Sequence, residues 1–398
     1  MIVFFYFIYD NFIMINNDNI TTYHNTVKKL SNLDKLSDEQ FMLQYKLKCP
    51  NSTYIPAILP AKRRIVVFGD IHGDLETAIS MLKSSKVVKE LPNKKLRWVG
   101  GDTYVVQVGD QIDRCRPIGN MLCSNKHTTN NDEASDIKIL ELFTDLHKEA
   151  VKHGGAVISL LGNHEIMNAV GNMDYVSHLG LKDFENYVDP NDPSKRFTSG
   201  MHARAHAFKP GNEYGKYLGC NRLPAVVIGS NIFVHAGIVD GLIRQIGLSG
   251  NIDFETINRA IRAWLLGLLK TKYIKDIINS TKHSMFWTRI LGKIPPDVPL
   301  DNPVCSKHIS KVLKMFNVNG IIIGHTPQSF IYSDDINATC GGKVWRVDNG
   351  SSSAFNNFDK GFLETGNIAH SRRVQYLEII NDRCYRICDE FGCKRPVM

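Results

Sequence analysis

The sequence predicts an α/β fold in which strands and helices alternate from Lys62 onward. Short runs of β-branched and aromatic residues are typical of buried strands, and the segments between them carry apolar residues at helical spacing. Several of these strands stop at a glycine that is followed by Asp, Asn or His, at the strand end where open α/β sheets place their ligands. The 398 residues, 43% of them hydrophobic, suffice for one large domain or two ordinary ones.

Residues 1–60 are predicted to form an N-terminal extension. The stretch from Met1 to Ile15 is apolar, but Asp10 interrupts it, and a spanning helix needs roughly 18 or more consecutive apolar residues. It also lacks the basic start and cleavage site of a signal peptide. We expect it to pack on the body or to be irregular, with a membrane anchor or uncleaved signal as the alternative. A short helix is expected near Asp38 to Lys46.

The body is predicted to contain six strands and two principal helices. The expected strands are Ile65–Phe68, Tyr104–Val108, Ala156–Leu161, Ala225–Val234, Gly320–Ile323 and Lys343–Val347. The expected helices are Leu75–Ser84 and Asp136–His153. The second has a broad apolar face and is followed by Gly154-Gly155, which stops helices.

Residues 61–390 are expected to form the domain, with insertions at about 116–135, 172–222 and 253–315. The first insertion is polar and rich in turns, and the other two could form a helical cap. Val374–Ile380 and Cys384–Ile387 flank Asn381-Asp382, which predicts a closing hairpin. Residues 391–398 are then a C-terminal tail.

The charge and the cysteines limit the partners and the compartment. A net charge of +8 suits anionic substrates, while the absence of a strong basic run argues against nucleic acid. The nine cysteines include no Cys-x2-Cys pair. We expect mostly reduced thiols in a reducing, cytoplasmic compartment. One or two disulfides in the C-terminal tail are the alternative.

Five apolar segments end in motifs that carry metal-type ligands. They are Gly69-Asp70-Ile71-His72-Gly73, Gly109-Asp110-Gln111-Ile112-Asp113-Arg114, Gly162-Asn163-His164-Glu165, His235-Ala236-Gly237 and Gly324-His325-Thr326. Mixed oxygen and nitrogen donors suit borderline divalent metals such as manganese, iron or zinc. Two such ions roughly 3.5–4 Å apart can hold a hydroxide and stabilise in-line displacement at phosphorus.

The five motifs resemble those of the calcineurin-like metallophosphoesterases, and more narrowly the phosphoprotein phosphatase pattern GDxHG, GDxxDRG, GNHE, HAG and GH. LGNHEIMN at 161–168, GSNIFVHAGI at 229–238 and GHTPQ at 324–328 look most like the bacterial-type, Shewanella-like phosphatases. The resemblance covers roughly Lys62 to Gly350. It implies a four-layer αββα sandwich with two mixed sheets and a dimetal site at one loop edge.

The resemblance also implies roles for individual residues. The residues that would hold two divalent ions, with Asp110 bridging, are Asp70, His72, Asp110, Asn163, His235 and His325. His164 matches the general acid, oriented by Asp113. Arg114 matches a phosphate-binding arginine, and Arg289 in Trp287-Thr288-Arg289 is a candidate second one.

Two further segments are expected to support this site. Glu165 is expected to be a structural carboxylate, and Asp348-Asn349-Gly350-Ser351 to buttress the site. The chain also departs from the family pattern. Cys115 replaces the glycine of GDxxDRG, Leu161 replaces the arginine of the LRGNHE form, and the SAPNYC segment is missing.

The chemistry of these residues agrees with phosphomonoester hydrolysis. Metal ions lower the pKa of bound water to roughly 7, a histidine paired with a carboxylate can protonate a leaving oxygen, and an arginine fork fits phosphoryl oxygens. We therefore expect a metal-dependent phosphatase of phosphorylated protein at Ser/Thr or Tyr. A metal-bridging hydroxide would attack in line, with His164 as general acid. A dinucleoside polyphosphate hydrolase and an inactive phosphoprotein-binding scaffold are the alternatives.

Overall fold

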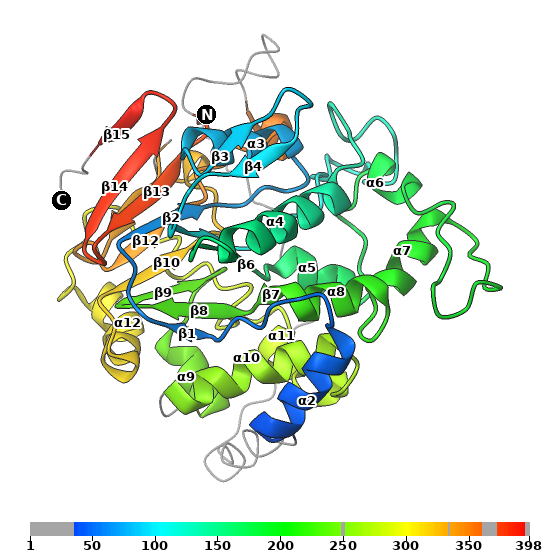
Figure 1. Cartoon of the computed structure of the whole chain (residues 1–398). Helices are drawn as coiled ribbons and strands as arrows, with labels where there is room; N and C mark the ends of the chain where they lie inside the picture. The colour runs from blue at the N-terminus through cyan, green and yellow to red at the C-terminus, as the bar shows by residue number, and fades with distance from the viewer. Residues whose placement is uncertain (1–35, 248–250, 333–334, 360–371, 395–398) are drawn as a thin grey trace.

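The computed structural model describes residues 36–247, 251–332, 335–359 and 372–394. The expectations for Met1–Ile15, and for the last four residues of the tail, lie outside these ranges. Within them the strands form two large sheets and one small ribbon, with helices on the outside (Figure 1). None of the helices in these ranges combines the length and apolarity that crossing a membrane requires.

The first large sheet contains seven strands in the order β15-β14-β13-β2-β5-β6-β7. Their bounds are β2 Arg64–Phe68, β5 Tyr104–Gln107, β6 Ala156–Leu160, β7 Arg222–Leu223, β13 Tyr376–Ile380, β14 Cys384–Asp389 and β15 Gly392–Lys394. Strands β2, β5, β6 and β7 run parallel, and the antiparallel β13–β14–β15 strands extend the sheet from β2. The predicted C-terminal hairpin is therefore confirmed.

The second large sheet contains six strands in the order β1-β8-β9-β10-β12-β11. Their bounds are β1 Ile58–Leu59, β8 Ala225–Ile228, β9 Asn231–Val234, β10 Gly320–Ile323, β11 Asn337–Thr339 and β12 Val344–Arg346. The prediction of one strand over 225–234 is wrong, because the chain reverses there and β8 pairs antiparallel with β9. Gly229 makes the reversal possible with a φ of +57°, which glycine adopts without steric cost.

The two sheets pack face to face and helices cover both outer faces. Val67 and Val106 from one sheet meet Phe233, Ile322 and Trp345 from the other in a shared core. Helices α3 (Leu75–Ser84) and α4 (Asp136–Val151), with the ribbon β3–β4 (Val88–Glu90, Leu96–Trp98), cover the seven-stranded sheet. Helices α9 (Asp240–Ile246), α10 (Asn251–Leu265) and α12 (Pro303–Phe316) lie on the opposite side (Figure 1). This confirms the αββα sandwich.

Shorter helices fill the connections between these layers. They are α2 Asp38–Lys48, α5 Asn163–Ala169, α6 His178–Lys182, α7 Gly200–Phe208, α8 Glu213–Asn221, α11 Lys275–Ile278 and the 3-10 turns η1 Thr271–Tyr273, η2 Gln328–Phe330 and η3 Ser353–Phe358. Ser37 caps helix α2, and its hydroxyl accepts from the backbone N–H of Gln40 in a capping box. The helix expected near Asp38 to Lys46 is thus confirmed.

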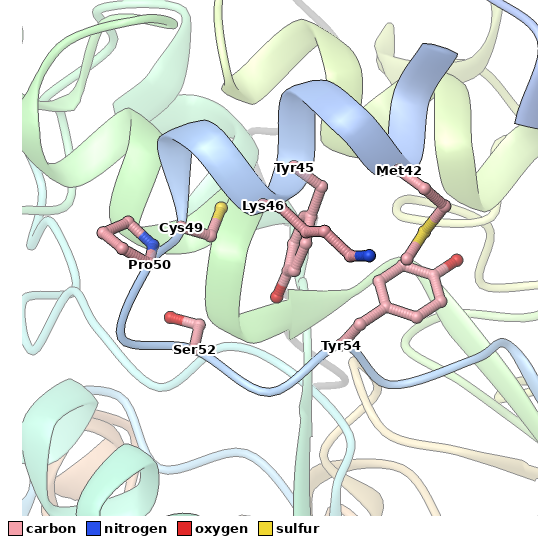
Figure 2. Close-up of a pocket in the computed structure, with 7 residues that line it drawn as sticks. All are labelled: Met42, Tyr45, Lys46, Cys49, Pro50, Ser52 and Tyr54. Carbon is pink, nitrogen blue, oxygen red and sulfur yellow. The ribbon is translucent and has the colours of Figure 1, made fainter. Parts of the chain in front are cut away.

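Residues 36–60 pack against the domain. Phe41 and Tyr45 of α2 are buried, and the Tyr45 hydroxyl donates to the Cys220 carbonyl at 2.7 Å. A pocket of about 410 Å³ lies beside this helix and is lined by Met42, Tyr45, Lys46, Cys49, Pro50, Ser52 and Tyr54 (Figure 2). It contains no histidine or carboxylate, so it lacks the residues of hydrolytic chemistry.

Eight of the nine cysteines are paired, and the expectation of mostly reduced thiols is wrong. The pairs are Cys49–Cys220, Cys115–Cys123, Cys305–Cys340 and Cys388–Cys393, and Cys384 is free. Only the last pair involves the C-terminal tail, through Cys393. The Cys49–Cys220 partners are 171 positions apart, so only the fold brings them together. Because such bonds persist in oxidising surroundings, the cysteine argument for a cytoplasmic protein no longer holds.

Replacing Cys49 and Cys220 together with alanine should lower the free energy of unfolding by about 2–5 kcal/mol, because a long loop in the unfolded chain is released. Denaturant titration of the native and variant proteins measures the difference. Cys384→Ser serves as the matched control and should leave stability unchanged. Thiol titration of the unfolded native protein without reductant should find Cys384 alone, and nine reactive thiols would contradict the pairing.

Candidate active site

The ends of five strands bring the motif residues together. Asp70 and His72 follow β2, and Asp110 follows β5. Asn163 begins α5 directly after β6, while His235 follows β9 and His325 follows β10. All six side chains are at most 5% exposed. The structure therefore assembles in one place every residue that the sequence suggested as a metal ligand.

Asp110 stands at the centre of this assembly. Its Oδ2 lies 3.2 Å from His235 Nε2, 3.8 Å from His72 Nε2 and 3.9 Å from His164 Nε2. Two groups of potential ligands share it: one with His72 and His164, the other with His235 and His325. A single carboxylate oxygen shared by two groups is the arrangement expected of a bridging ligand.

Asp70 and Asn163 complete the two sides of the assembly. Asp70 Oδ2 lies 3.8 Å from His72 Nε2, on the first side. Asn163 Oδ1 lies 2.9 Å from His235 Nε2, and His325 Nδ1 lies 3.2 Å from the same nitrogen, on the second side.

The hydrogen bonds behind the imidazoles leave lone pairs facing one another. His235 Nδ1 lies 2.9 Å from the Val108 carbonyl and His325 Nε2 lies 3.1 Å from the Trp287 carbonyl, so these nitrogens carry the protons. The other nitrogens, His235 Nε2 and His325 Nδ1, face each other and Asn163 Oδ1. Burial lowers the pKa of His235, but the Asp110 carboxylate and the Val108 carbonyl together raise it more, so a positive charge is favoured at this point, as a proton on His235 or as a metal ion. The residues therefore fit divalent metal ions.

The electrostatics of the site lead to the same conclusion. Burial raises the pKa of Asp70, and the nearby carboxylates of Asp348 and Asp110 raise it further. Burial lowers the pKa of His72 and of His325, which keeps both imidazoles neutral as metal ligands must be. A positive ion would relieve this concentration of acceptors and carboxylates.

The backbone around the site is strained. Four residues that carry chemistry adopt left-handed conformations that side chains other than glycine rarely take: His72 (φ +49°), Asp110 (φ +53°), Asp113 (φ +71°) and His325 (φ +66°). Glu165 holds one of these loops, because its carboxylate accepts from the backbone N–H groups of Asp110 at 3.0 Å and Gln111 at 2.8 Å. Its expected structural role is confirmed.

Two glycines are needed because ligand carboxylates pass directly over them. A Cβ on Gly162 would lie 2.1 Å from Asp110 Oδ1, and one on Gly324 would lie 2.2 Å from Asp70 Oδ1. Any side chain at either position would displace a carboxylate. The loop of the second motif therefore packs directly against that of the third, and the loop of the first against that of the fifth.

His164 is oriented by a buried carboxylate. Its Nδ1 lies 2.9 Å from Asp113 Oδ2, and its ring packs edge-on against Tyr175 at 5.0 Å between centroids. The Asn168 amide donates to both oxygens of Asp113, at 2.9 and 3.0 Å. The pair that the sequence proposed is therefore in contact, and Nε2 of His164 points toward Asp110.

The predicted arginines occupy different surroundings. Arg114 is buried and donates to the Gly73 carbonyl and to Glu133, both at 2.9 Å, while its buried Nε has no hydrogen-bond partner among the described residues. Arg289 is exposed and donates to the His325 carbonyl at 2.8 Å. The two guanidinium groups thus contact the backbone of two different loops, those of the first and fifth motifs.

The segment after β12 supports the first motif. Ser352 donates through Oγ to the Ile71 carbonyl at 2.8 Å, and the Ser353 N–H donates to Asp74 at 2.7 Å. Asp348 Oδ1 accepts from the Gly350 N–H at 2.9 Å, and burial raises the pKa of Asp348 to about 6. The contacts to the first motif thus come from Ser352 and Ser353, directly after the expected segment Asp348–Ser351.

Sequence reasoning missed several neighbours of the site. Arg116 lies with its guanidinium carbon 4.8 Å from the Phe355 ring centre, and Phe355 packs against His72. Arg204 of α7 reaches Asp113 from the 172–222 segment. The four-residue spacing of His164 and Asn168 on α5 could have suggested Asn168, but Arg204 stands alone in the sequence, without a motif.

Comparison with known proteins agrees with the geometry. Residues 63–329 match the family described as calcineurin-like phosphoesterase. The chain belongs to this family. Calcineurin-like phosphoesterases use a dimetal site, and the two groups that share Asp110 can provide one here.

Its curated relatives include named phosphatases. Shewanella-like protein phosphatase 2 of Arabidopsis thaliana is 28% identical over 73% of this chain and 71% of its own length. Shewanella-like protein phosphatase 1 of Plasmodium berghei is 27% identical over 73% of this chain and 67% of its own. An uncharacterized protein of Acanthamoeba polyphaga mimivirus is 42% identical over 62% of this chain and 96% of its own.

Solved structures share the fold. A cold-active protein tyrosine phosphatase solved at 1.1 Å superposes with a TM-score of 0.60 and 20% identity, over 86% of this chain and 81% of that one. The enzyme of a psychrophilic Shewanella species gives a TM-score of 0.58 at 20% identity, over 90% of this chain and 85% of that one. At this identity the two structures show that the fold is shared.

Proposed function

We propose that this calcineurin-like phosphoesterase is a metal-dependent phosphoprotein phosphatase that hydrolyses phosphomonoesters. The observation that carries the proposal is Asp110 Oδ2, which lies within 3.9 Å of three imidazole nitrogens, beside a histidine–aspartate pair. The named relatives of this chain support a phosphorylated protein as the substrate.

Six residues would hold two divalent ions, with manganese, iron and zinc all compatible with their donor atoms. Asp70, His72 and Asp110 would hold one ion, and Asn163, His235 and His325 the other, with Asp110 shared. When bound, the ions would supply Lewis-acid stabilisation of the phosphoryl oxygens and activation of water.

The remaining side chains would handle the proton and the phosphoryl charge. Nε2 of His164 would donate a proton to the leaving oxygen, because the bond from Nδ1 to Asp113 fixes the ring and stabilises its charged form. Arg114 and Arg289 would contact phosphoryl oxygens, and the buried Nε of Arg114 still needs an acceptor. The leaving oxygen and the phosphoryl oxygens would thus each be contacted by a side chain of the site.

A substrate panel tests the proposal. The full chain, loaded in turn with Mn²⁺, Fe²⁺ and Zn²⁺, is assayed against peptides carrying phosphoserine, phosphothreonine or phosphotyrosine and against diadenosine tetraphosphate. Preferential turnover of phosphopeptides is the expected result. Faster hydrolysis of the nucleotide would favour the small-molecule alternative, and no turnover of any substrate with any ion would favour a scaffold.

A further inference from the structure

We infer that Arg204 is a positioning residue for the proton donor, an inference that rests on the proposed function. Arg204 lies on α7, within the 172–222 segment that the sequence suggests is a cap. Its side chain is fully buried, and the ring centres of Phe184 and Phe208 lie 5.5 and 5.0 Å from its guanidinium carbon. A buried guanidinium in such surroundings requires several partners.

Those partners are the residues that hold His164. Arg204 donates from Nε to Asn168 Oδ1 at 2.8 Å, and from Nη2 to Asp113 Oδ1 at 3.3 Å and Asp136 Oδ2 at 2.7 Å. Asn168 in turn donates to both oxygens of Asp113. A continuous set of hydrogen bonds therefore runs from α7 through Asn168 and Asp113 to the imidazole.

This connection fixes the plane of the Asp113 carboxylate. Arg204 prevents the Asn168 amide from turning, because its Oδ1 is held by the guanidinium while its Nδ2 points at Asp113. Asn168 Nδ2 also donates to the His164 carbonyl at 3.0 Å. Without Arg204, the Asp113 carboxylate loses the Nη2 donor and Asn168 loses the partner of its Oδ1, so the carboxylate that orients His164 Nδ1 is held less firmly. The 172–222 segment thus contributes to turnover through Asn168 and Asp113.

Arg204 does not reach the reacting atoms, so its removal should affect only the protonation of the leaving oxygen by His164. Protonation matters more for a basic leaving group than for an acidic one. Loss of Arg204 should therefore slow phenyl phosphate more than p-nitrophenyl phosphate, whose leaving phenol is more acidic. A purely structural role for Arg204 would slow both substrates by the same factor.

The test compares Arg204→Met with the native protein on these two substrates under saturating Mn²⁺. We expect kcat for phenyl phosphate to fall by about 10–100-fold, the usual cost of losing a supporting partner, with KM unchanged. The kcat for p-nitrophenyl phosphate should fall by about threefold at most. Arg204→Lys keeps the charge but not the planar guanidinium, so its kcat for phenyl phosphate should lie between those of the native protein and Arg204→Met.

Arg262→Met is the matched control. Arg262 is also buried and donates to the Gly219 and Ile55 carbonyls, and it contacts neither His164 nor Asp113. Its loss should lower stability without changing the ratio of the two kcat values. If Arg204→Met is poorly folded, Arg204→Met/Asp136→Asn removes one charge of each sign. Its control is Asp136→Asn alone, because Asp136 Oδ1 also accepts from the Asp113 N–H at 3.2 Å.

Equal loss on both substrates, no loss, or the same change of ratio in Arg262→Met would overturn the inference. A native protein that hydrolyses neither these two substrates nor the phosphopeptides with any of the three ions would instead overturn the proposed function, and the inference with it. The two failures are therefore distinguishable.

Discussion

Replacing His164 with asparagine is expected to lower kcat by about 10²–10⁴ while leaving the metal content intact. Among the described residues, His164 is the only imidazole of the assembly whose nitrogen on the side away from Asp110 contacts a carboxylate. That nitrogen, Nδ1, lies 2.9 Å from Asp113 Oδ2. Asparagine retains a polar side chain at the start of α5 but cannot donate a proton to a leaving oxygen. Steady-state kinetics with a phosphotyrosine peptide, together with elemental analysis of the purified variant, give the two quantities.

The control for this variant is His153→Asn, an exposed position outside the site. It should keep full activity. If His164→Asn also kept full activity, His164 would not be the proton donor. A variant that lost its metal together with its activity would instead make His164 a ligand, which its place beside Asp110 and His72 also allows.

Replacing Asp110 with asparagine is expected to lower kcat/KM by about 10³ or more and to reduce the bound metal. The substitution keeps the shape of the side chain and removes the charge shared by both groups of ligands. Asparagine also tolerates the left-handed φ of +53° at this position, so the loop should keep its conformation. Activity assays and elemental analysis before and after chelation measure the effect.

Asp297→Asn is the matched control, because Asp297 is exposed and also left-handed, with a φ of +63°. It should leave both activity and metal content unchanged. An Asp110→Asn protein with native metal content and native turnover would show that the two groups of ligands do not share this carboxylate.

The long elements of the two sheets and the helices α3 and α4 were predictable from the sequence, whereas most of the short strands and short helices were not. The predicted helix Leu75–Ser84 has the same bounds in the structure, where Asp74 is the N-cap and the apolar face is regular. The run from Ala225 to Val234 was misjudged because its β-branched residues hid the Gly229-Ser230 turn at its centre. The sandwich itself followed from the family resemblance rather than from periodicity.

The site was predictable where ligands follow strands, and unpredictable where support comes from distant segments. Asp70 and His325 are 255 positions apart, yet each stands in a motif that marks it. Arg204 has no such mark, because its role depends on where α7 packs. The same reason explains the disulfides, since Cys49 and Cys220 meet only after α2 and α8 are in place.

The left-handed conformations of His72, Asp110 and His325 have an evolutionary consequence. Each costs on the order of 1–3 kcal/mol, and glycine or asparagine at these positions would relieve it. Natural selection for hydrolysis must therefore act continually against a gain in stability. A copy selected for stability alone would therefore be expected to gain glycine or asparagine at these positions and to lose hydrolysis.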